Sequence, residues 1–300
     1  MTRFNLQVIL FTLVLMALVY FIKPNRISTN ISDTINDKIY FTSVRDNLKN
    51  FIYSVNTTKP DDIKSKSVVI KKLGDGYSYL KVRTDQRWPI ASITKLMTAT
   101  IALEKFAPGQ LIYFNDKIIS TEGASGGFQS GEVFTAIELV KALMVVSSND
   151  AAMALAESYV YHNFIDAMQV KAAELGMRQT TFYDPTGLSF LNQSTIDDLE
   201  KLVKYVFEKH PEILNFSRER SVSIGGKRNL VNINEFAGQF DFVGGKTGYT
   251  DDANGNLISL FRDQSGGGNP LLIIVLGTED RFGDTRRLLD YFNNSSYNKH

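Results

Sequence analysis

Three short motifs, far apart along the chain, most strongly constrain how it can fold. They are Ser92-Ile-Thr-Lys95, Ser147-Ser-Asn149 and Lys246-Thr-Gly248. Each motif alone is weak, because both S-x-x-K and S-x-N occur again in Ser296-Tyr-Asn-Lys299, near the chain's end. K-T-G occurs once. Their order and context predict a fold that brings all of them around one site.

The first motif has the residue types of an activated nucleophile. A serine hydroxyl reacts poorly unless a neighbouring base takes its proton. Residues i and i+3 share one face of a helix, so Lys95 can reach the Ser92 oxygen. Lysine acts as a base only when neutral, and burial or a nearby positive charge such as Lys246 lowers its pKa. We therefore predict that Ser92 is the nucleophile and Lys95 the general base.

The second and third motifs add a proton path and a binding site for an anion. We expect Ser147 and Asn149 to project from a turn between two helices, Ser147 relaying a proton to the leaving amine and Asn149 holding the base and a substrate amide. Lys246 and Thr247 offer a cation and a hydroxyl for a terminal carboxylate. Gly248 allows close approach of a substrate backbone.

Two alternatives compete with these roles. Ser147 and Asn149 are also ordinary helix-capping residue types and need no catalytic role. The run Gly244-Gly-Lys-Thr247 resembles part of a phosphate-binding loop, but that loop requires glycine six residues before the lysine. Phe240 stands there, so a nucleotide site is disfavoured.

Charge and composition exclude several other functions. The chain has 33 Lys plus Arg against 32 Asp plus Glu, a net charge of +1, which gives no overall field for nucleic acid. It has no cysteine, which excludes thiol catalysis, disulfides and cysteine-ligated zinc. Its 3 histidines show no H-E-x-x-H spacing. We therefore predict neither a metal nor another cofactor.

The N-terminus predicts a membrane anchor. The uncharged apolar run from Phe4 to Ile22 approaches the roughly 20 residues that a helix needs to cross a bilayer. No small-x-small cleavage site follows it, so an uncleaved signal anchor is favoured over a cleaved signal peptide. We expect an anchor over residues 1–25, a polar stalk over 26–62 and the folded domain over 63–300.

Strand patterns occur at both ends of this domain, with helical patterns between them. The sequence therefore predicts an α/β (α+β) fold, in which an antiparallel sheet of N- and C-terminal strands is flanked by helices and an all-helical lobe is inserted. Expected strands are 67–70, 77–82, 256–261 and 271–276, with another around the K-T-G run; expected helices begin near 92, 135 and 151 and cover 164–175, 194–207 and 281–292.

Longer stretches around the motifs carry a family resemblance. They are Pro89 to Thr98, Ser147 to Ala152, Glu174 to Met177 with Asp184 to Leu188, Gly245 to Thr250, and Arg281 with Arg286 to Tyr291. Through them, residues from about 65 to 293 resemble the serine D-alanyl-D-alanine carboxypeptidases among the low-molecular-mass penicillin-binding proteins. These enzymes belong to a superfamily with β-lactamase-like folds.

The resemblance implies further roles. It makes Ser92 the acylated residue, and it places an oxyanion hole at the backbone N–H groups of Ser92 and Tyr249, where such donors are worth about 100- to 1,000-fold in rate. Arg281 matches a family arginine that helps to hold the terminal carboxylate, although a structural salt bridge would also explain it. Ser148 stands where glycine is common in this family, a change that can alter the turn.

The resemblance also implies a function. The expected reaction removes the terminal D-Ala from peptidoglycan stem peptides, with β-lactams as covalent inhibitors and the domain outside the cell membrane. A D,D-endopeptidase that cuts peptidoglycan cross-links remains an alternative. A class A-like β-lactamase is disfavoured because Tyr183 to Ser189 contains no glutamate. A membrane-tethered wall-binding scaffold is the non-enzymatic alternative.

Overall fold

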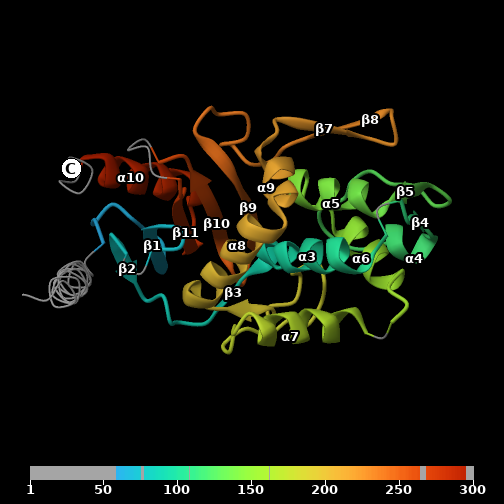
Figure 1. Ribbon diagram of the computed structural model, residues 1–300, viewed down its shortest axis with the longest axis horizontal. Helices are drawn as coiled ribbons and strands as arrows, with labels where there is room; N and C mark the ends of the chain where they lie inside the picture. The colour runs from blue at the N-terminus through green and yellow to red at the C-terminus, as the bar shows by residue number, and fades with distance from the viewer. Residues whose placement is uncertain (1–58, 76–77, 108, 162, 264–267, 295–300) are drawn as a thin grey trace, which may run out of the picture. The chain divides into compact units, whose positions relative to one another are not determined.

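An antiparallel sheet of 5 strands, ordered β2-β1-β11-β10-β9, joins the two ends of the folded domain. Its middle strand, β11, comes from the C-terminal part of the chain and pairs directly with β1 (Figure 1). The sheet consists of β1 (Ser67–Lys72), β2 (Leu80–Val82), β9 (Phe242–Thr250), β10 (Asn254–Phe261) and β11 (Leu271–Thr278). The predicted sheet of N- and C-terminal strands is confirmed.

The computed structural model describes residues 59–75, 78–107, 109–161, 163–263 and 268–294. The predicted anchor and nearly all of the predicted stalk lie outside these ranges. Within them, none of the helices combines the length and the apolar character that a membrane crossing requires.

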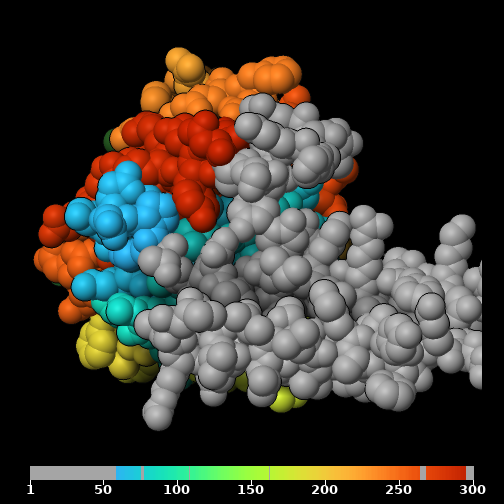
Figure 2. All heavy atoms as spheres, turned by 90° about the vertical axis from the view of Figure 1, so that its left-hand side faces the viewer, coloured from blue at the N-terminus to red at the C-terminus, as the bar shows by residue number. Residues whose placement is uncertain are grey.

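Both faces of the sheet are covered, and side-chain alternation along the strands assigns each residue to a face. Val68 and Ile70 of β1 pack on the side of α10 (Arg281–Asn294), together with Leu288. Val69, between them, belongs to the larger core shared with the helical lobe. Figure 2 shows α10 and the first strands, red and blue, next to each other on one face of the molecule.

The helical lobe lies between β2 and β9 in the sequence, as predicted (Figure 1). Its helices are the 3₁₀ turn η1 (Ala91–Thr94), α3 (Lys95–Lys105), α4 (Asp116–Ile119), α5 (Ala136–Val145), α6 (Asn149–Glu157), α7 (Phe164–Glu174), α8 (Ile196–Lys209) and α9 (Pro211–Arg218). Small ladders pair β3 (Trp88–Pro89) with β6 (Gln193–Ser194), β4 (Leu111–Tyr113) with β5 (Val133–Thr135), and β7 (Ser221–Ile224) with β8 (Arg228–Val231).

Local capping signals explain where these helices begin. The Thr135–Glu138 capping box is present at α5, with the Thr135 N–H donating to Glu138 over 2.9 Å. The expected helix from Ser194 instead begins at Ile196, because Thr195 is its N-cap and Ser194 belongs to β6. We did not predict α9 or the β7–β8 hairpin.

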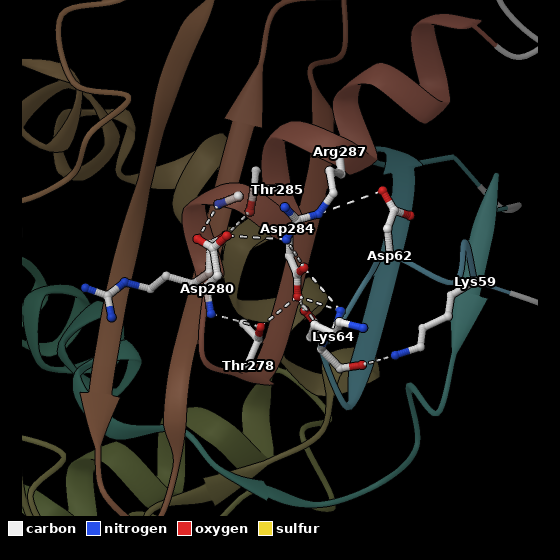
Figure 3. A network of polar contacts seen from close by, with 11 residues as sticks. Lys59, Asp62, Lys64, Thr278, Asp280, Asp284, Thr285 and Arg287 are labelled. Carbon is white, nitrogen blue, oxygen red and sulfur yellow. Dashed lines mark hydrogen bonds and ion pairs between the residues drawn. The ribbon is translucent and has the colours of Figure 1, made fainter.

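A buried carboxylate ties the start of β1 to α10 (Figure 3). Asp284 of α10 accepts hydrogen bonds from the Ser65 N–H at 2.8 Å, from Thr278 Oγ1 at 2.7 Å and from Arg287 Nη2 at 2.6 Å. The Lys64 N–H also donates to it. Asp284 is fully buried, so one side chain links both ends of the described chain.

Candidate active site

Ser92 lies in η1, one 3₁₀ turn before α3 begins at Lys95. This agrees with its predicted place at a helix N-terminus. The residue before it, Ala91, has φ of +48°, a backbone conformation that side-chain-bearing residues rarely adopt. Such strained residues concentrate at functional sites, where surrounding packing maintains them.

Lys95 is fully buried and its ammonium group has three partners. Nζ donates to Ser92 Oγ at 2.8 Å, to Asn149 Oδ1 at 2.7 Å and to the Thr186 carbonyl at 2.5 Å. Its hydrogen-bonding capacity is therefore filled by these oxygens. The predicted contacts of Lys95 with Ser92 and Asn149 are both present.

Burial lowers the pKa of Lys95 to about 7, although the charges of Asp184 and Asp150 act in the opposite direction. Of the two causes named from the sequence, burial is the one that lowers this pKa, because it removes the ammonium from water. The charge of Lys246 does not contribute to the lowering. Near pH 7, a substantial fraction of Lys95 is therefore neutral and able to accept a proton.

The Ser147-Ser-Asn149 motif forms the predicted turn between helices α5 and α6. Ser147 has φ of +59°, and Ser148 caps α6 by accepting the Ala151 N–H at 3.0 Å. The side-chain amide of Asn149 donates to the Glu122 carbonyl at 2.7 Å. Ser148 thus supplies a cap that glycine could not provide.

Lys246 reaches the site from β9 and is buried. Its Nζ donates to Ser147 Oγ at 2.9 Å and to the Thr247 carbonyl at 2.8 Å. Its pKa is lowered, first by burial and then by the charges of Lys95 and Arg281. The second and third motifs are therefore in direct contact, and the charge of Lys95 acts on Lys246.

Gly248 allows β9 to pack against η1. A Cβ atom at this position would lie 2.9 Å from the Ile90 carbonyl oxygen and 3.3 Å from Ala91 Cβ. Close approach of a substrate to this glycine stays a prediction, and the contact present in the structure is the close approach of the strand to the nucleophile turn. Tyr249 follows and is exposed, and β9 is an edge strand of the sheet.

Arg281 begins α10 and lies near this cationic side of the site. Its Nε is buried and has no hydrogen-bond partner within the described part of the chain. The salt bridge that would give Arg281 a purely structural role is also absent from the described part of the chain. Burial lowers the pKa of Arg281, while Glu235 and Tyr249 raise it, and its charge in turn lowers the pKa of Lys246. An arginine without an acidic partner suits an incoming carboxylate.

The loop after α7 supplies a contact that motif reasoning missed, the Thr186 carbonyl on Lys95. Asp184 organises this loop by accepting the N–H groups of Thr186 and Gly187, each at 2.7 Å. Gly187 has φ of +86°, and a Cβ there would lie 2.0 Å from the Ala91 carbonyl. The Asp-Pro-Thr-Gly sequence is a turn signal, but it does not indicate which group the Thr186 carbonyl contacts.

The arrangement joins a hydroxyl, a base that is partly neutral at pH 7 and a region of positive charge. These are the requirements for acyl transfer from a substrate that ends in a carboxylate. Within the described ranges, no cluster of three or more His, Cys, Asp or Glu residues could hold a metal.

Comparison of sequences identifies related proteins. Residues 54–280 match the profile of a family described as D-alanyl-D-alanine carboxypeptidase. The chain is 31% identical to the D-alanyl-D-alanine carboxypeptidase DacF of Bacillus subtilis over 76% of this chain and 61% of that protein. It is 36% identical to a D-alanyl-D-alanine endopeptidase of Haemophilus influenzae over 58% of this chain and 63% of that protein. The matches thus span about three fifths of these relatives.

Solved structures share the fold. A D-alanyl-D-alanine carboxypeptidase from Mycobacterium tuberculosis superposes with a TM-score of 0.71 at 24% identity, covering 81% of this chain and 96% of that one. Penicillin-binding protein D2 from Listeria monocytogenes, in an ampicillin-bound form, superposes with a TM-score of 0.70 at 26% identity, covering 78% of this chain and 98% of that one.

Proposed function

This chain belongs to the D-alanyl-D-alanine carboxypeptidase family, and we propose that it is a serine D,D-carboxypeptidase that removes the terminal D-Ala from peptidoglycan stem peptides. The observation that carries this proposal is the 2.8 Å contact between Lys95 Nζ and Ser92 Oγ. Because the pKa of Lys95 is about 7, the amine can take the hydroxyl proton as the oxygen attacks.

In the acylation step, Ser92 Oγ attacks the carbonyl carbon of the terminal amide and its proton passes to neutral Lys95. The negative charge on the former carbonyl oxygen is held by the backbone N–H groups of Ser92 and Tyr249. The edge position of β9 supports this role, because an edge strand has backbone groups that no neighbouring strand pairs.

Collapse of the tetrahedral intermediate breaks the C–N bond and leaves an ester on Ser92. The proton that Lys95 received passes through the Ser147 hydroxyl, which is hydrogen-bonded to Lys246, to the departing D-Ala amine, so Lys95 is neutral again. Water then attacks the ester while Lys95 takes its proton, and Lys95 returns this proton to the departing Ser92 oxygen, which regenerates the serine. Asn149 holds Lys95 in place throughout and can also bind a substrate amide.

The terminal carboxylate binds at Lys246, Thr247 and Arg281. In the free protein, burial and neighbouring positive charges disfavour the charged form of Lys246. A carboxylate supplies the opposite charge and favours that form again. Charge complementarity therefore selects substrates with a free C-terminal carboxylate, while Gly248 keeps this strand close to the nucleophile.

The same group of residues suits β-lactams, which present a carboxylate beside a reactive amide, so covalent inhibition on Ser92 is part of the proposal. A β-lactamase activity is less well supported. Asp184 is a carboxylate near the base, but it accepts hydrogen bonds from Thr186, Ser189 and Asn192 within its own loop. With its oxygens engaged in this way, it is poorly placed to activate water for rapid deacylation.

A D,D-endopeptidase is the second candidate, supported by the 36% identical relative from Haemophilus influenzae. The same residues would cleave a cross-link whose leaving amine carries more of the wall. Muropeptide analysis after incubation with intact peptidoglycan separates the two activities. Loss of terminal D-Ala without loss of cross-linked dimers supports the carboxypeptidase.

We also propose that residues 1–25 anchor the protein in the cell membrane and that 26–62 form a stalk. The uncharged run from Phe4 to Ile22 supports this. The catalytic domain would then lie outside the membrane, where its peptidoglycan substrate is found. Carbonate extraction of membranes, followed by protease treatment of intact spheroplasts, tests both the anchoring and the orientation.

Covalent labelling with a fluorescent penicillin tests the function most directly. We expect the full-length wild-type protein in detergent to be labelled slowly and durably, and the Ser92→Ala variant to show no label. Ser120→Ala, which changes an exposed serine elsewhere, should be labelled like the wild type. If the folded wild type takes up no label, the wall-binding scaffold is favoured instead. Rapid turnover of benzylpenicillin would support a β-lactamase.

A further inference from the structure

Asp150 is a buried carboxylate beside the site to which the proposed reaction assigns no step. It is 1% exposed. Its oxygens accept Ser125 Oγ–H at 2.7 Å, the Gly126 N–H at 3.1 Å and the Ala151 N–H at 3.0 Å. Ser148 Oγ also donates to it. One carboxylate thus joins the start of α6 to a loop from a different part of the lobe.

The same loop determines how the neighbouring residue, Asn149, is oriented. The Asn149 N–H donates to the Ala124 carbonyl and its side-chain amide to the Glu122 carbonyl, each at 2.7 Å. With the amide N–H₂ directed at Glu122, the amide oxygen faces Lys95. A Cβ on Gly123 would lie only 2.6 Å from Asn149 Nδ2, so the loop is packed closely against the amide.

We propose that Asp150 is a positioning residue: by holding the 122–126 loop against α6, it directs the Asn149 amide oxygen at Lys95 and keeps that amine beside Ser92. The inference rests on the proposed function and adds to it a residue that touches neither substrate nor nucleophile. Ser148 takes part because its hydroxyl both caps α6 and donates to this carboxylate.

The chemistry of the contacts requires a carboxylate. Its two oxygens accept hydrogen bonds on the loop side from Ser125 and Gly126 and on the helix side from Ser148 and Ala151. An amide of the same shape has one oxygen, so it must lose at least one of these bonds. The buried negative charge of Asp150 also acts on Lys95, together with that of Asp184, and both favour the protonated amine. The charge of Lys95 in turn lowers the pKa of Lys246.

The test is Asp150→Asn in the full-length protein in detergent, with benzylpenicillin acylation followed by stopped flow between pH 5.5 and 9. We expect the limiting acylation rate to fall about ten-fold, because the base is less well held. The half-saturating concentration should change little, because the carboxylate site is intact. The midpoint of the pH profile should move to lower pH, because a charge that favours protonated Lys95 is gone.

Asp198→Asn is the matched control. Asp198 is also a buried carboxylate near a helix start and accepts hydrogen bonds from Gln179 N–H and Thr180 Oγ1, but it lies in α8. This variant should lose thermal stability while keeping the acylation rate and the pH midpoint. If Asp150→Asn behaves in the same way, Asp150 is only structural and the inference is overturned.

Ser125→Ala decides the question if Asp150→Asn does not fold. It removes one hydrogen bond to the carboxylate from a residue at the surface, and we expect about three-fold slower acylation. An unchanged rate would overturn the inference. A wild-type protein that is not acylated at all would instead overturn the proposed function, so the two failures are distinguishable.

Discussion

At the scale of single residues, the protonation of Lys95 sets the pH range in which the site reacts. Only the neutral amine accepts the Ser92 proton, and the pKa of Lys95 is about 7 because of burial. We therefore predict that the benzylpenicillin acylation rate rises with pH, with a midpoint near 7. Stopped-flow measurements between pH 5.5 and 9 on the full-length protein check this.

The control is thermal unfolding over the same pH range, which separates loss of the fold from protonation of the base. A rate that is independent of pH in this range, with the fold intact, would show that Lys95 is not the base.

Replacement of Lys95 by glutamine should slow acylation about 100- to 10,000-fold, the usual contribution of a general base.

At the scale of elements, the site depends on how closely β9 approaches η1. We predict that Gly248→Ala slows acylation about ten-fold or more, because the added Cβ meets the Ile90 carbonyl at 2.9 Å and must push the strand away from Ser92. The displacement would carry the Tyr249 N–H away from the developing oxyanion. Penicillin labelling over time measures the effect.

Gly109→Ala is the comparison for this variant, because nothing lies within 4 Å of a Cβ placed there. It should be acylated at the wild-type rate. If Gly248→Ala reacts equally fast, the strand's close approach to η1 does not matter for the reaction.

The same elements show what the sequence can predict. Periodicity located α5, α7 and α10, and the i, i+3 spacing anticipated the contact of Lys95 with Ser92. The Thr186 carbonyl was missed, because a backbone oxygen leaves no mark on residue type. The start of α8 was placed two residues early, since Ser194 and Thr195 are both good caps and only the pairing of β3 with β6 decides between them.

At the scale of the whole domain, the sequence order of strands and helices was sufficient to predict the sheet and the inserted lobe. In this sheet, β1 pairs with β11, although most of the domain's sequence lies between the two strands. The Asp284 network was not predictable, because its partners come from distant segments: Lys64 and Ser65 before β1, Thr278 in β11 and Arg287 in α10 (Figure 3). No local pattern links such residues.

Substitution of Asp284 therefore tests whether this carboxylate holds the two ends of the domain together. Burial alone would raise its pKa, but hydrogen bonds from Ser65, Arg287 and Thr278 lower it below the usual 3.8. Asp284→Asn should cost about 3 kcal/mol at pH 7, or about 6–12 °C in the unfolding temperature, because buried donors lose their acceptor.

Two further measurements test this prediction: the pH dependence of the stability loss, and the same substitution at a neighbouring exposed carboxylate. A lowered carboxyl pKa contributes stability above pH 3.8 that is lost as the pH falls through the folded-state pKa, so the difference between Asp284→Asn and the wild type should shrink below pH 3.8. Asp280→Asn, an exposed change in the same network, should cost less than about 1 kcal/mol. Equal losses for both variants in thermal unfolding of the full-length protein would mean that the buried Asp284 does not link the two ends, since an exposed carboxylate would serve as well.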